Sequence, residues 1–491
     1  MQILFKKTEI PCDTTLLIGV HAGNQLSKTA KKINALTDGA LTRMLDNSGF
    51  DGKIGETYTV AGGSGLSVNR LICVGLGDKA ESSDLNAQLI GAAAMRAVLK
   101  TQEKTAEFAT DDLPAAQVAF GAKLAAYRFD KYKTLAQKPV LEQFVLLTPL
   151  AQEAQNDYEI LSAAAKGVYT ARDLMNEPAN MMTPKDFAAR AEELKKYGLT
   201  VEIYDKKQLA SKGFNVMLGV AQGSANEPVL AVVQWKGAAG KDVPFVVVGK
   251  GVCFDSGGIS LKPAAHMDEM KFDMAGAAIA LGTLQTLAMR KAKVNAAAVM
   301  ALVENMPSGS AQRPGDIVKS LAGLTVEVAN TDAEGRLILG DAMWYAQERF
   351  APAVMVDLAT LTGACVVALG HEYAGLFSND SSVCDAVKKA SDKTGERVWE
   401  MPLCDDFDKQ IESDVADIRN MGSVERSAGS CIAAAFLKRF VKPETKWVHL
   451  DIAGTAYLSK DTPLSVKGAT AFGVRLLNAF SKDYFEEKAA E

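Results

Sequence analysis

The segment V-P-F-V-V-V-G (243–249) is a short, nearly continuous apolar run that is followed by a charged residue, Lys250. Such a run is typical of a strand buried on both faces, as in a parallel sheet covered by helices. Similar runs predict further strands at 294–303, 324–328, 353–358 and 447–452, and alanine-rich or amphipathic stretches predict helices at 275–289 and 340–348. Strands that alternate with helices indicate an α/β fold with a mostly parallel central sheet flanked by helices.

The first 150 residues have a second, smaller α/β pattern. Strands are predicted at 70–75 and within 139–150, and a helix at 86–99. A helical stretch at 153–174 ends at N-E-P-A-N-M-M-T-P (176–184), which contains two prolines. We therefore predict two domains, residues 1–160 and 161–491. Loops are predicted around three glycines (62, 63 and 65) and around Gly75 and Gly77, and neither loop completes a dinucleotide-binding fingerprint.

Composition excludes several classes of protein. Of the 491 residues, 48% are hydrophobic and 23% are charged, which excludes intrinsic disorder as the main feature. The net charge of −5 does not favour a nucleic-acid-binding protein. We see no signal peptide, and we interpret the apolar stretch 351–370, which contains Asp357, as a buried strand with its loop rather than a membrane span. Seven widely spaced cysteines without a C-x-x-C pair indicate reduced thiols in a cytoplasmic protein.

Charged residues gather where predicted strands end or helices begin. They are Lys250, Asp255, Asp273, Asp332 and Glu334, all in apolar or glycine-rich surroundings. A charge buried there is unfavourable unless it is paired or binds a metal. Four carboxylates balance the charge of two divalent cations, and carboxylates can bridge two metals about 3.5–4 Å apart. The lysine could be a ligand only as the neutral amine. Structural salt bridges or solvated loops are the alternative, and the spacing alone leaves both open.

The segment N-T-D-A-E-G-R-L-I-L (330–339) resembles the signature of the leucyl aminopeptidase family, also called the cytosol aminopeptidases. Six further segments resemble other blocks of this family in the same order: K-G-V-C-F-D-S-G-G-I-S-L-K-P (250–263), M-K-F-D-M-A-G-A-A (270–278), E-N-M-P-S-G (304–309), R-P-G-D-I (313–317), L-A-T-L-T-G-A (358–364) and H-L-D-I-A-G-T-A (449–456). The resemblance covers residues 170–480. Residues 1–160 resemble the family's variable, macro-like N-terminal domain in length and position only. Gln312, Cys431 and Ile432 depart from the family pattern, which puts substrate preference in doubt.

The resemblance implies a role for each matched residue. The metal ligands would be Lys250, Asp255, Asp273, Asp332 (also through its backbone carbonyl) and Glu334, and the catalytic residues would be Lys262 and Arg336. The substrate-binding residues would be Met270, Asn330, Thr360, Gly363 and Ala453. Asn330 either positions the substrate or caps a turn. Gly335 is interpreted as letting the backbone approach an anion held by Arg336.

The resemblance also implies an activity. The enzyme would release N-terminal residues, preferably leucine or another apolar residue, from peptides with a free N-terminus. It would use two divalent ions per subunit, of manganese, zinc or magnesium. A bicarbonate held by Arg336 would take the part of the general base, and the protein would be a cytoplasmic homohexamer that serves peptide turnover.

Other functions fit the residues less well. Ser256 lacks the first glycine of a G-x-S-x-G nucleophile elbow, because Phe254 is there. Lys250 could form a Schiff base, but the neighbouring carboxylates fit metals better. A two-metal phosphoesterase uses similar carboxylates, yet no phosphate cradle is evident. With only four histidines and no H-E-x-x-H, a histidine-based zinc site is not expected. DNA binding would need a Lys/Arg cluster on the N-terminal domain. A non-catalytic relative would be expected to lack some of the implied site residues, and all of them are present.

Overall fold

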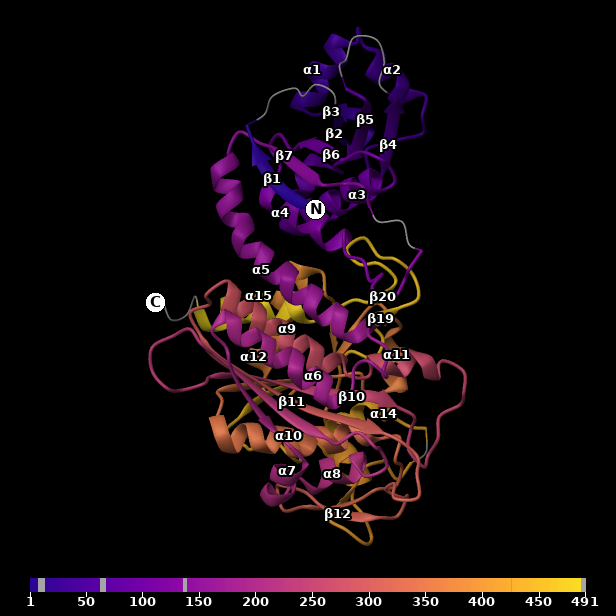
Figure 1. The fold of residues 1–491 in the computed structure, drawn as a ribbon, viewed down its shortest axis with the longest axis vertical. Helices are drawn as coiled ribbons and strands as arrows, with labels where there is room; N and C mark the ends of the chain where they lie inside the picture. Colours follow the sequence, from indigo (N-terminus) through magenta and orange to yellow (C-terminus); the bar gives the residue numbers. More distant parts are fainter. Residues whose placement is uncertain (8–13, 62–67, 136–138, 425, 487–491) are drawn as a thin grey trace. The chain divides into compact units, whose positions relative to one another are not determined.

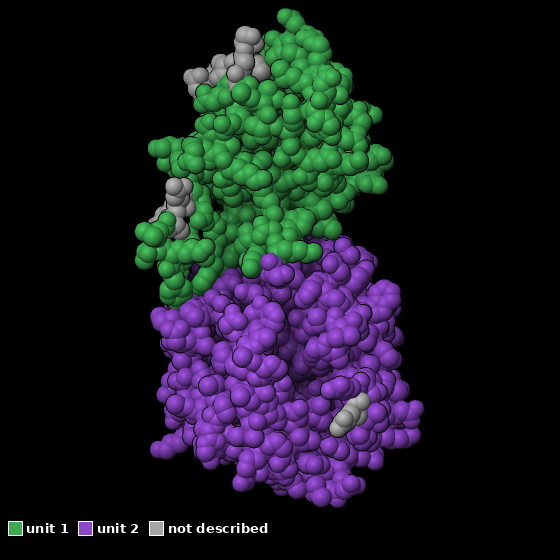
Figure 2. Space-filling view, turned by 90° about the vertical axis from the view of Figure 1, so that its right-hand side faces the viewer, with its two compact units in different colours: residues 1–165, 460–467 green, residues 166–459, 468–491 purple. Residues whose placement is uncertain are grey.

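The computed structural model describes residues 1–7, 14–61, 68–135, 139–424 and 426–486 (Figure 1). The chain forms two compact units, coloured separately in Figure 2: residues 1–165 with 460–467 (unit 1), and residues 166–459 with 468–491 (unit 2). Helix α5 (Ala151–Asn176) runs across the division, and the domain boundary expected after residue 160 lies within it. The glycine loop at 62–65 and Cys12 lie outside the described residues. The six cysteines within them form no disulfide.

Unit 1 is built on a sheet with strand order β1-β7-β6-β2-β5-β4, in which β5–β4 is the one antiparallel neighbour pair along this path of described strands. Short β3 pairs antiparallel with β2. The strands are β1 (Gln2–Lys6), β2 (Thr15–His21), β3 (Gln25–Leu26), β4 (Thr57–Ala61), β5 (Arg70–Gly75), β6 (Thr105–Ala109) and β7 (Gln143–Leu147). The helices besides α5 are α1 (Lys28–Leu36), α2 (Ala40–Asp46), α3 (Asp84–Leu99) and α4 (Ala115–Ala125).

Alternating side chains of this sheet enter two apolar clusters, because successive residues of a strand point to opposite faces. Leu17 belongs to the cluster that contains α3 and α4, whereas Leu16 and Ile18 belong to the cluster that contains α1 and α2. The sheet is therefore covered by helices on both faces, and its carboxyl edge is left to the loops. The strand predicted at 70–75 and the helix at 86–99 are observed, the helix beginning two residues earlier.

Unit 2 contains the larger sheet, with strand order β16-β15-β18-β14-β10-β11-β9-β8. Its centre, β18-β14-β10-β11, is parallel, and antiparallel pairs join the outer strands to it. These strands are β8 (Thr200–Tyr204), β9 (Val229–Lys236), β10 (Phe245–Asp255), β11 (Asn295–Asn305), β14 (Val354–Ala359), β15 (Ala374–Ser378), β16 (Val398–Glu400) and β18 (Lys446–Asp451). Smaller sheets pair β12 (Ile317–Lys319), β13 (Thr325–Glu327) and β17 (Ile418–Arg419), and β19 (Tyr457–Leu458) with β20 (Gly468–Ala469).

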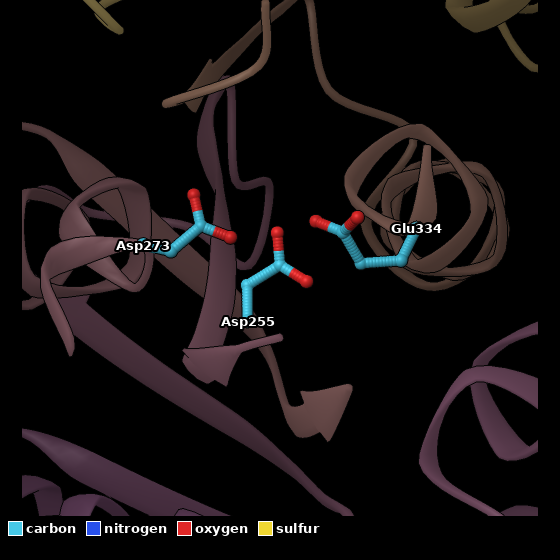
Figure 3. Close-up of side chains that lie close together, drawn as sticks. All are labelled: Asp255, Asp273 and Glu334. Atoms are coloured by element: carbon cyan, nitrogen blue, oxygen red, sulfur yellow. The ribbon is translucent and has the colours of Figure 1, made fainter. Parts of the chain in front are cut away.

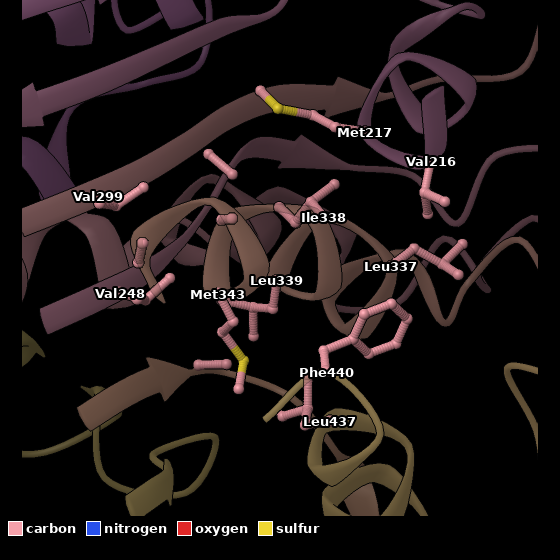
Figure 4. Close-up of a cluster of buried hydrophobic side chains, with 14 of the residues drawn as sticks. Val216, Met217, Val248, Val299, Leu337, Ile338, Leu339, Met343, Leu437 and Phe440 are labelled. Carbon is pink, nitrogen blue, oxygen red and sulfur yellow. The ribbon is translucent and has the colours of Figure 1, made fainter. Parts of the chain in front are cut away.

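Helices cover both faces of this sheet too. The helices are α6 (Pro184–Glu192), α7 (Lys206–Lys212), α8 (Asn215–Ala221), α9 (Ala275–Met289), α10 (Glu334–Phe350), α11 (Gly363–Leu369), α12 (Ser381–Thr394), α13 (Asp405–Gln410), α14 (Gly429–Lys438) and α15 (Val474–Ser481). In Figure 4, α10 places Leu337, Leu339 and Met343 in an apolar layer between the sheet and α14. Each fully buried aliphatic side chain stabilises the fold by about 1.5–3 kcal/mol, so this layer holds the start of α10 in place.

Helix α9 packs on the sheet at very close range. A Cβ at Gly249 in β10 would lie 2.5 Å from the Cα of Ala277, and one at Gly276 would lie 2.0 Å from the carbonyl oxygen of Leu358 in β14. Both glycines are required by this approach, which brings the residues before α9 to the carboxyl end of β10. By length and composition alone, Met267–Met289 could cross a membrane, but 89% of its most apolar window is buried inside the protein. The apolar stretch at 351–370 forms β14 and α11.

Two predicted elements are longer in the structure than the sequence suggested. The strand expected at 243–249 continues through Lys250 to Asp255, and the helix expected at 340–348 begins at Glu334. The extensions, K-G-V-C-F-D (250–255) and E-G-R-L-I-L (334–339), mix charged residues and glycine with apolar side chains. Both extensions keep regular structure because Lys250 of the strand pairs with Glu334 of the helix inside the fold. Lys250, Asp255 and Glu334 therefore lie on a strand and a helix rather than on loops.

Candidate active site

Three buried carboxylates converge at the carboxyl end of the central strands. They are Asp255 at the end of β10, Asp273 directly before α9, and Glu334 in the first turn of α10. Each offers an oxygen within 4.8 Å of the others, and Figure 3 shows the three groups facing one another. None is more than 5% exposed. Bringing three like charges together in this way is unfavourable without cations.

Lys250 is the cation between two of these carboxylates. Its Nζ lies 2.8 Å from Asp273 Oδ2 and 2.9 Å from Glu334 Oε1, and it donates to the backbone carbonyl of Thr360 at 2.8 Å. The stem of Lys250 passes over Gly335, where a Cβ would lie 2.7 Å from the lysine Cε. The glycine therefore makes room for this lysine, and its expected part in the approach of an anion stays a prediction.

Lys262 is a second cation at the same edge. Its Nζ lies 2.7 Å from Asp255 Oδ2 and also contacts Asp332 Oδ1. Its side chain is 22% exposed, whereas that of Lys250 is 4% exposed. Lys262 thus lies on the solvent side of the cluster, where a substrate can reach it, and Lys250 lies beneath.

The pKa values report an excess of negative charge. Burial and then the charge of Asp255 raise the pKa of Glu334 to about 8, against the opposing effect of Lys250. Burial raises the pKa of Asp273 to about 6, and the pKa of Asp332 is raised by burial and by Asp255. Burial acts to lower the pKa of Lys250, but the surrounding carboxylates outweigh it and the pKa is raised. Two lysines thus neutralise only half of the four carboxylates.

The donor set of this cluster fits divalent cations. Oε2 of the buried Glu334 has no hydrogen-bond donor among the described residues, and Glu334 Oε1 and Asp273 Oδ2 both face the same group, Lys250 Nζ. A buried acceptor without a donor costs about 1–3 kcal/mol or more, and a cation removes that cost. Oxygen ligands suit magnesium and manganese, and zinc accepts carboxylate ligands as well.

Arg336 is buried in the first turn of α10 and has no carboxylate partner among the described residues. Its Nη1 donates to the backbone carbonyl of Asn420 at 2.8 Å, its Nε has no acceptor, and it forms no ion pair within the part of the chain that the structure describes. Burial lowers its pKa to about 10, although Glu334 and Asp451 act to raise it. Its planar donor edge therefore remains available to an anion.

Two asparagines position this site, and the sequence analysis missed both. Asn305, at the end of β11, donates from Nδ2 to Asp255 Oδ1 at 2.8 Å and to the backbone carbonyl of Thr331 at 2.9 Å. Asn420 accepts from the backbone N–H groups of Ala329 and Asn330 and donates to the carbonyl of Asn330 at 2.7 Å. Asn305 lies in the segment E-N-M-P-S-G (304–309) that resembles the family, just after an apolar strand, whereas Asn420 lies in no such segment.

The residues expected to bind substrate differ in their surroundings. Thr360 Oγ1 donates to Asp273 Oδ1 at 2.7 Å, so it orients a carboxylate of the cluster. Asn330 Oδ1 accepts from the N–H of Asp332 at 2.8 Å, which is the turn-capping geometry. Gly363, the first residue of α11, is exposed, and a Cβ there would meet nothing within 4 Å. Met270 and Ala453 are half-buried.

The buried Asp451 joins the loop that carries Thr360 to the loop that carries Ala453. Asp451, the last residue of β18, accepts from the backbone N–H groups of Leu361 and Ala453, each at 3.2 Å. Its other oxygen accepts from the hydroxyl of Thr362 at 2.7 Å. The loop after β14 and the loop after β18 are therefore fixed to each other through a single carboxylate.

Ser256, the residue considered as the nucleophile of a serine hydrolase, is held in a structural hydrogen bond. Ser256 is buried, and its hydroxyl donates to the carbonyl of Asn305 at 2.7 Å. Of the residues that depart from the family pattern, Gln312 is close to Gly219 in α8, and Cys431 and Ile432 belong to the apolar layer beneath the sheet. None of the three contacts the carboxylate cluster in a hydrogen bond or ion pair that the described residues form.

Comparisons with known proteins agree with this geometry. Residues 169–478 match the catalytic domain of the cytosol aminopeptidase family, and residues 17–136 match its N-terminal domain. The chain belongs to the cytosol aminopeptidase family. It is a metal-dependent aminopeptidase, and therefore a hydrolase. A probable cytosol aminopeptidase of Caulobacter vibrioides is 45% identical over 99% of this chain and 100% of the relative.

Solved structures share the whole fold. A mutant of tomato leucine aminopeptidase is 30% identical with a TM-score of 0.88, covering 98% of this chain and 96% of its own. The bottromycin maturation enzyme BotP, solved in complex with Mn, is 32% identical with a TM-score of 0.84, covering 96% and 99%. The predicted two-domain α/β fold and the predicted family are thus confirmed.

Proposed function

We propose that this cytosol aminopeptidase holds two divalent metal ions and releases leucine or another apolar residue from the N-terminus of peptides. The observation that carries the proposal is the cluster of Asp255, Asp273 and Glu334, whose negative charge Lys250 and Lys262 only half neutralise. The metals would be held by Lys250, Asp255, Asp273, Asp332 and Glu334. When bound, they would polarise the scissile carbonyl, lower the pKa of a water and fix the free α-amine of the substrate.

Lys262 is the residue of this cluster that we assign to the oxyanion. It is more exposed than Lys250 and lies between Asp255 and Asp332, so a fixed positive charge faces the substrate side of the site. A donor placed where negative charge develops lowers the barrier without reorganisation during the reaction.

Arg336 is the residue that we assign to a bicarbonate. A planar guanidinium matches a planar oxyanion through paired hydrogen bonds, and this guanidinium is buried with an unused N–H. Asn420 holds Arg336 and the backbone of Ala329 and Asn330 together, which fixes the distance between the arginine and the segment that carries Asp332. A bound bicarbonate would accept a proton in place of a side-chain base.

Met270, Thr360, Gly363 and Ala453 are proposed to line the pocket for the first side chain, and Asn330 to place the substrate backbone. The open space over Gly363 supports this assignment. We further propose a homohexamer in the cytoplasm that turns over peptides; the names of the relatives support the location. The preference for leucine is supported by the family signature at 330–339.

The direct test is hydrolysis of leucine p-nitroanilide by the full chain after chelator treatment and after return of manganese, zinc or magnesium. The N-acetylated substrate serves as the matched control, because it lacks the free amine. We expect activity that depends on the metal and on the free amine. Activity that survives complete metal removal, or equal activity on the acetylated substrate, would overturn the proposal.

A further inference from the structure

Unit 1 contains a cavity that the aminopeptidase reaction does not use. It has a volume of about 740 Å³ and lies at the carboxyl ends of three adjacent parallel strands, β6, β2 and β5. His21 ends β2, Leu76 follows β5, and Thr110 follows β6, and all three line the cavity. Small-molecule sites are typically about 300–1,000 Å³ in volume, so this cavity is large enough for a metabolite.

The sheet topology places this cavity where α/β sheets bind ligands. After β2 the chain moves to β5 on one side, and after β6 it moves to β7 on the other side. The crossovers that lead from β2 to β5 and from β6 to β7 therefore run in opposite directions, and short β3, directly after β2, pairs with the end of β2 on the β6 side. A crevice opens at such a point, outside the carboxyl ends of the strands. The position of the cavity is thus a consequence of the strand order.

The walls combine an apolar surface with a charged rim. Buried Leu76, Ala87 and Ile90 form part of the wall, together with half-buried Leu26 and Leu113. The rim carries the exposed lysines 28, 31, 32 and 79 and the first turns of α1 and α3. An apolar wall beside cationic groups suits a ligand with an apolar, flat part and an anionic part.

The acidic residues of the rim are partly used inside the protein, whereas the lysines are not. Asp111 accepts from the N–H and the hydroxyl of Thr29, and Asp78 accepts from the N–H of Ala80. The four lysines form no ion pair within the described residues. His21 also presents a buried Nδ1 without a hydrogen-bond partner in the same part of the structure. With Asp78 and Asp111 held by internal hydrogen bonds, the remaining charged groups of the lining are four lysines and two carboxylates, Glu81 and Asp112, an excess of positive charge that favours a small anion.

We propose that this cavity binds a phosphorylated small molecule with a planar group, such as a nucleoside phosphate. The planar group would lie on the wall formed by Leu76, Ala87 and Ile90, and the phosphate would lie at the lysine rim. Gly75 is not part of a phosphate loop, because its open side faces the carbonyl of Lys53, 2.0 Å from where a Cβ would be. An extended polyanion such as DNA fits less well, because Glu81 and Asp112 are on the rim.

The test is calorimetric titration of the metal-loaded full chain with ADP, adenosine, pyrophosphate and a short DNA duplex. We expect saturable ADP binding that weakens as salt is raised, because the rim is exposed. The variant Lys31→Ala/Lys32→Ala should weaken ADP binding about tenfold or more, which corresponds to about 1.4 kcal/mol. The matched variant Lys100→Ala/Lys133→Ala removes two exposed lysines of unit 1 outside the cavity and should bind ADP as the parent does.

Each other outcome overturns the proposal. Adenosine binding as tightly as ADP would remove the role of the phosphate, and pyrophosphate binding as tightly as ADP would remove the role of the apolar wall. Displacement of ADP by the duplex at equal concentration would point to a DNA surface. ADP binding that is unchanged in Lys31→Ala/Lys32→Ala, or that disappears on metal removal, would place the ADP at the metal cluster of unit 2. Absence of saturable ADP binding would exclude the site.

Discussion

Both units carry charged residues at the carboxyl edge of a parallel sheet, but the charges are buried in unit 2 and exposed in unit 1. In unit 2, Lys250 and Glu334 are no more than 3% exposed and are paired at 2.9 Å. In unit 1, Lys31 and Lys32 are exposed on the first turns of a helix around an open cavity. The same sheet edge can therefore hold either compact ions at fixed positions or a larger ligand in exchange with solvent.

The difference follows from what covers each edge. In unit 2, the approach of α9 at Gly249 and the first turn of α10 at Gly335 bring backbone over the strand ends and exclude water. In unit 1, α1 and α3 begin beside the edge and leave it open. Buried charges interact strongly and respond little to salt, whereas exposed charges are screened within about 10 Å at 0.1 M salt.

Removing a buried carboxylate should have the largest effect. Glu334→Gln keeps the shape of the side chain but removes one negative charge from the cluster, so we expect kcat/KM to fall about a thousandfold or more, or about 4 kcal/mol. Metal content measured by mass spectrometry should fall with it. Glu348→Gln, on the exposed side of the same helix, should leave both unchanged. Full metal content in Glu334→Gln would contradict the assignment of this residue.

Removing the more exposed cation of the cluster should affect the rate more than binding. Lys262→Met is expected to lower kcat about 10²–10³-fold while the metal content is kept, as for the loss of one oxyanion donor. Substrate KM should change little. If the variant instead loses metal, Lys262 is a structural counter-ion of Asp255 and Asp332 rather than a catalytic group.

The asparagine behind Asp255 should tune metal affinity. Asn305→Ala removes the 2.8 Å hydrogen bond to Asp255, so we expect metal binding about 10–100-fold weaker, with activity restored by excess metal. Asn295→Ala is the matched control, because Asn295 is equally buried at the other end of β11 and bonds only to the backbone of Ala238, Gly240 and Asp242. A loss of activity that excess metal does not restore would argue against a positioning role.

The smallest effect is expected on thermal stability, at the buried pair of His449 and Asp357 outside the carboxylate cluster. Burial acts to lower the pKa of His449, but Asp357, 2.7 Å away, outweighs it and the pKa is raised above its ordinary value. The stabilising effect of this pair is therefore complete below the ordinary histidine pKa and is lost as pH rises through the raised pKa. The apparent Tm should fall by a few degrees over that range, the shift that about 1 kcal/mol produces in a large domain.

The matched variants isolate the pair. In Asp357→Asn the dependence of Tm on pH in this window should flatten, whereas the exposed Asp385→Asn should keep the slope of the parent protein. An unchanged slope in Asp357→Asn would show that another group titrates there.

Much of the architecture could be predicted because its apolar pattern is local. The run 243–249 predicted β10, and the alanine-rich stretch at 275–289 coincides with α9. The first turn of α10 could not be predicted, since N-T-D-A-E-G-R has the composition of a loop. Glu334 and Arg336 become helical because Gly335 accommodates Lys250 and the apolar layer holds the rest of the helix. Tertiary contacts therefore outweighed local propensity at this point.

The charged residues of the candidate site could be predicted from the sequence, but the residues that hold them in position could not. A charged residue in apolar sequence is unfavourable when buried unless it is paired or binds a metal. Lys250, Asp255, Asp273 and Glu334 could be identified for this reason. Asn420 could not be identified, because it lies 84 residues from Arg336 and bonds through its backbone carbonyl. The sequence also could not predict that residues 460–467 belong to unit 1. Their place there depends on long-range contacts, such as the hydrogen bond that Arg96 Nη2 donates to the carbonyl of Ser465 at 3.0 Å.

The most direct test of the central claim is the number of divalent ions bound per chain, counted by equilibrium dialysis of the chelator-treated protein against manganese. We predict two ions per chain in the parent protein, together with recovery of hydrolysis of leucine p-nitroanilide, and fewer than two in Glu334→Gln. A single ion per chain at full activity, or full activity with none, would contradict the proposal that the buried carboxylates and Lys250 form a two-metal site.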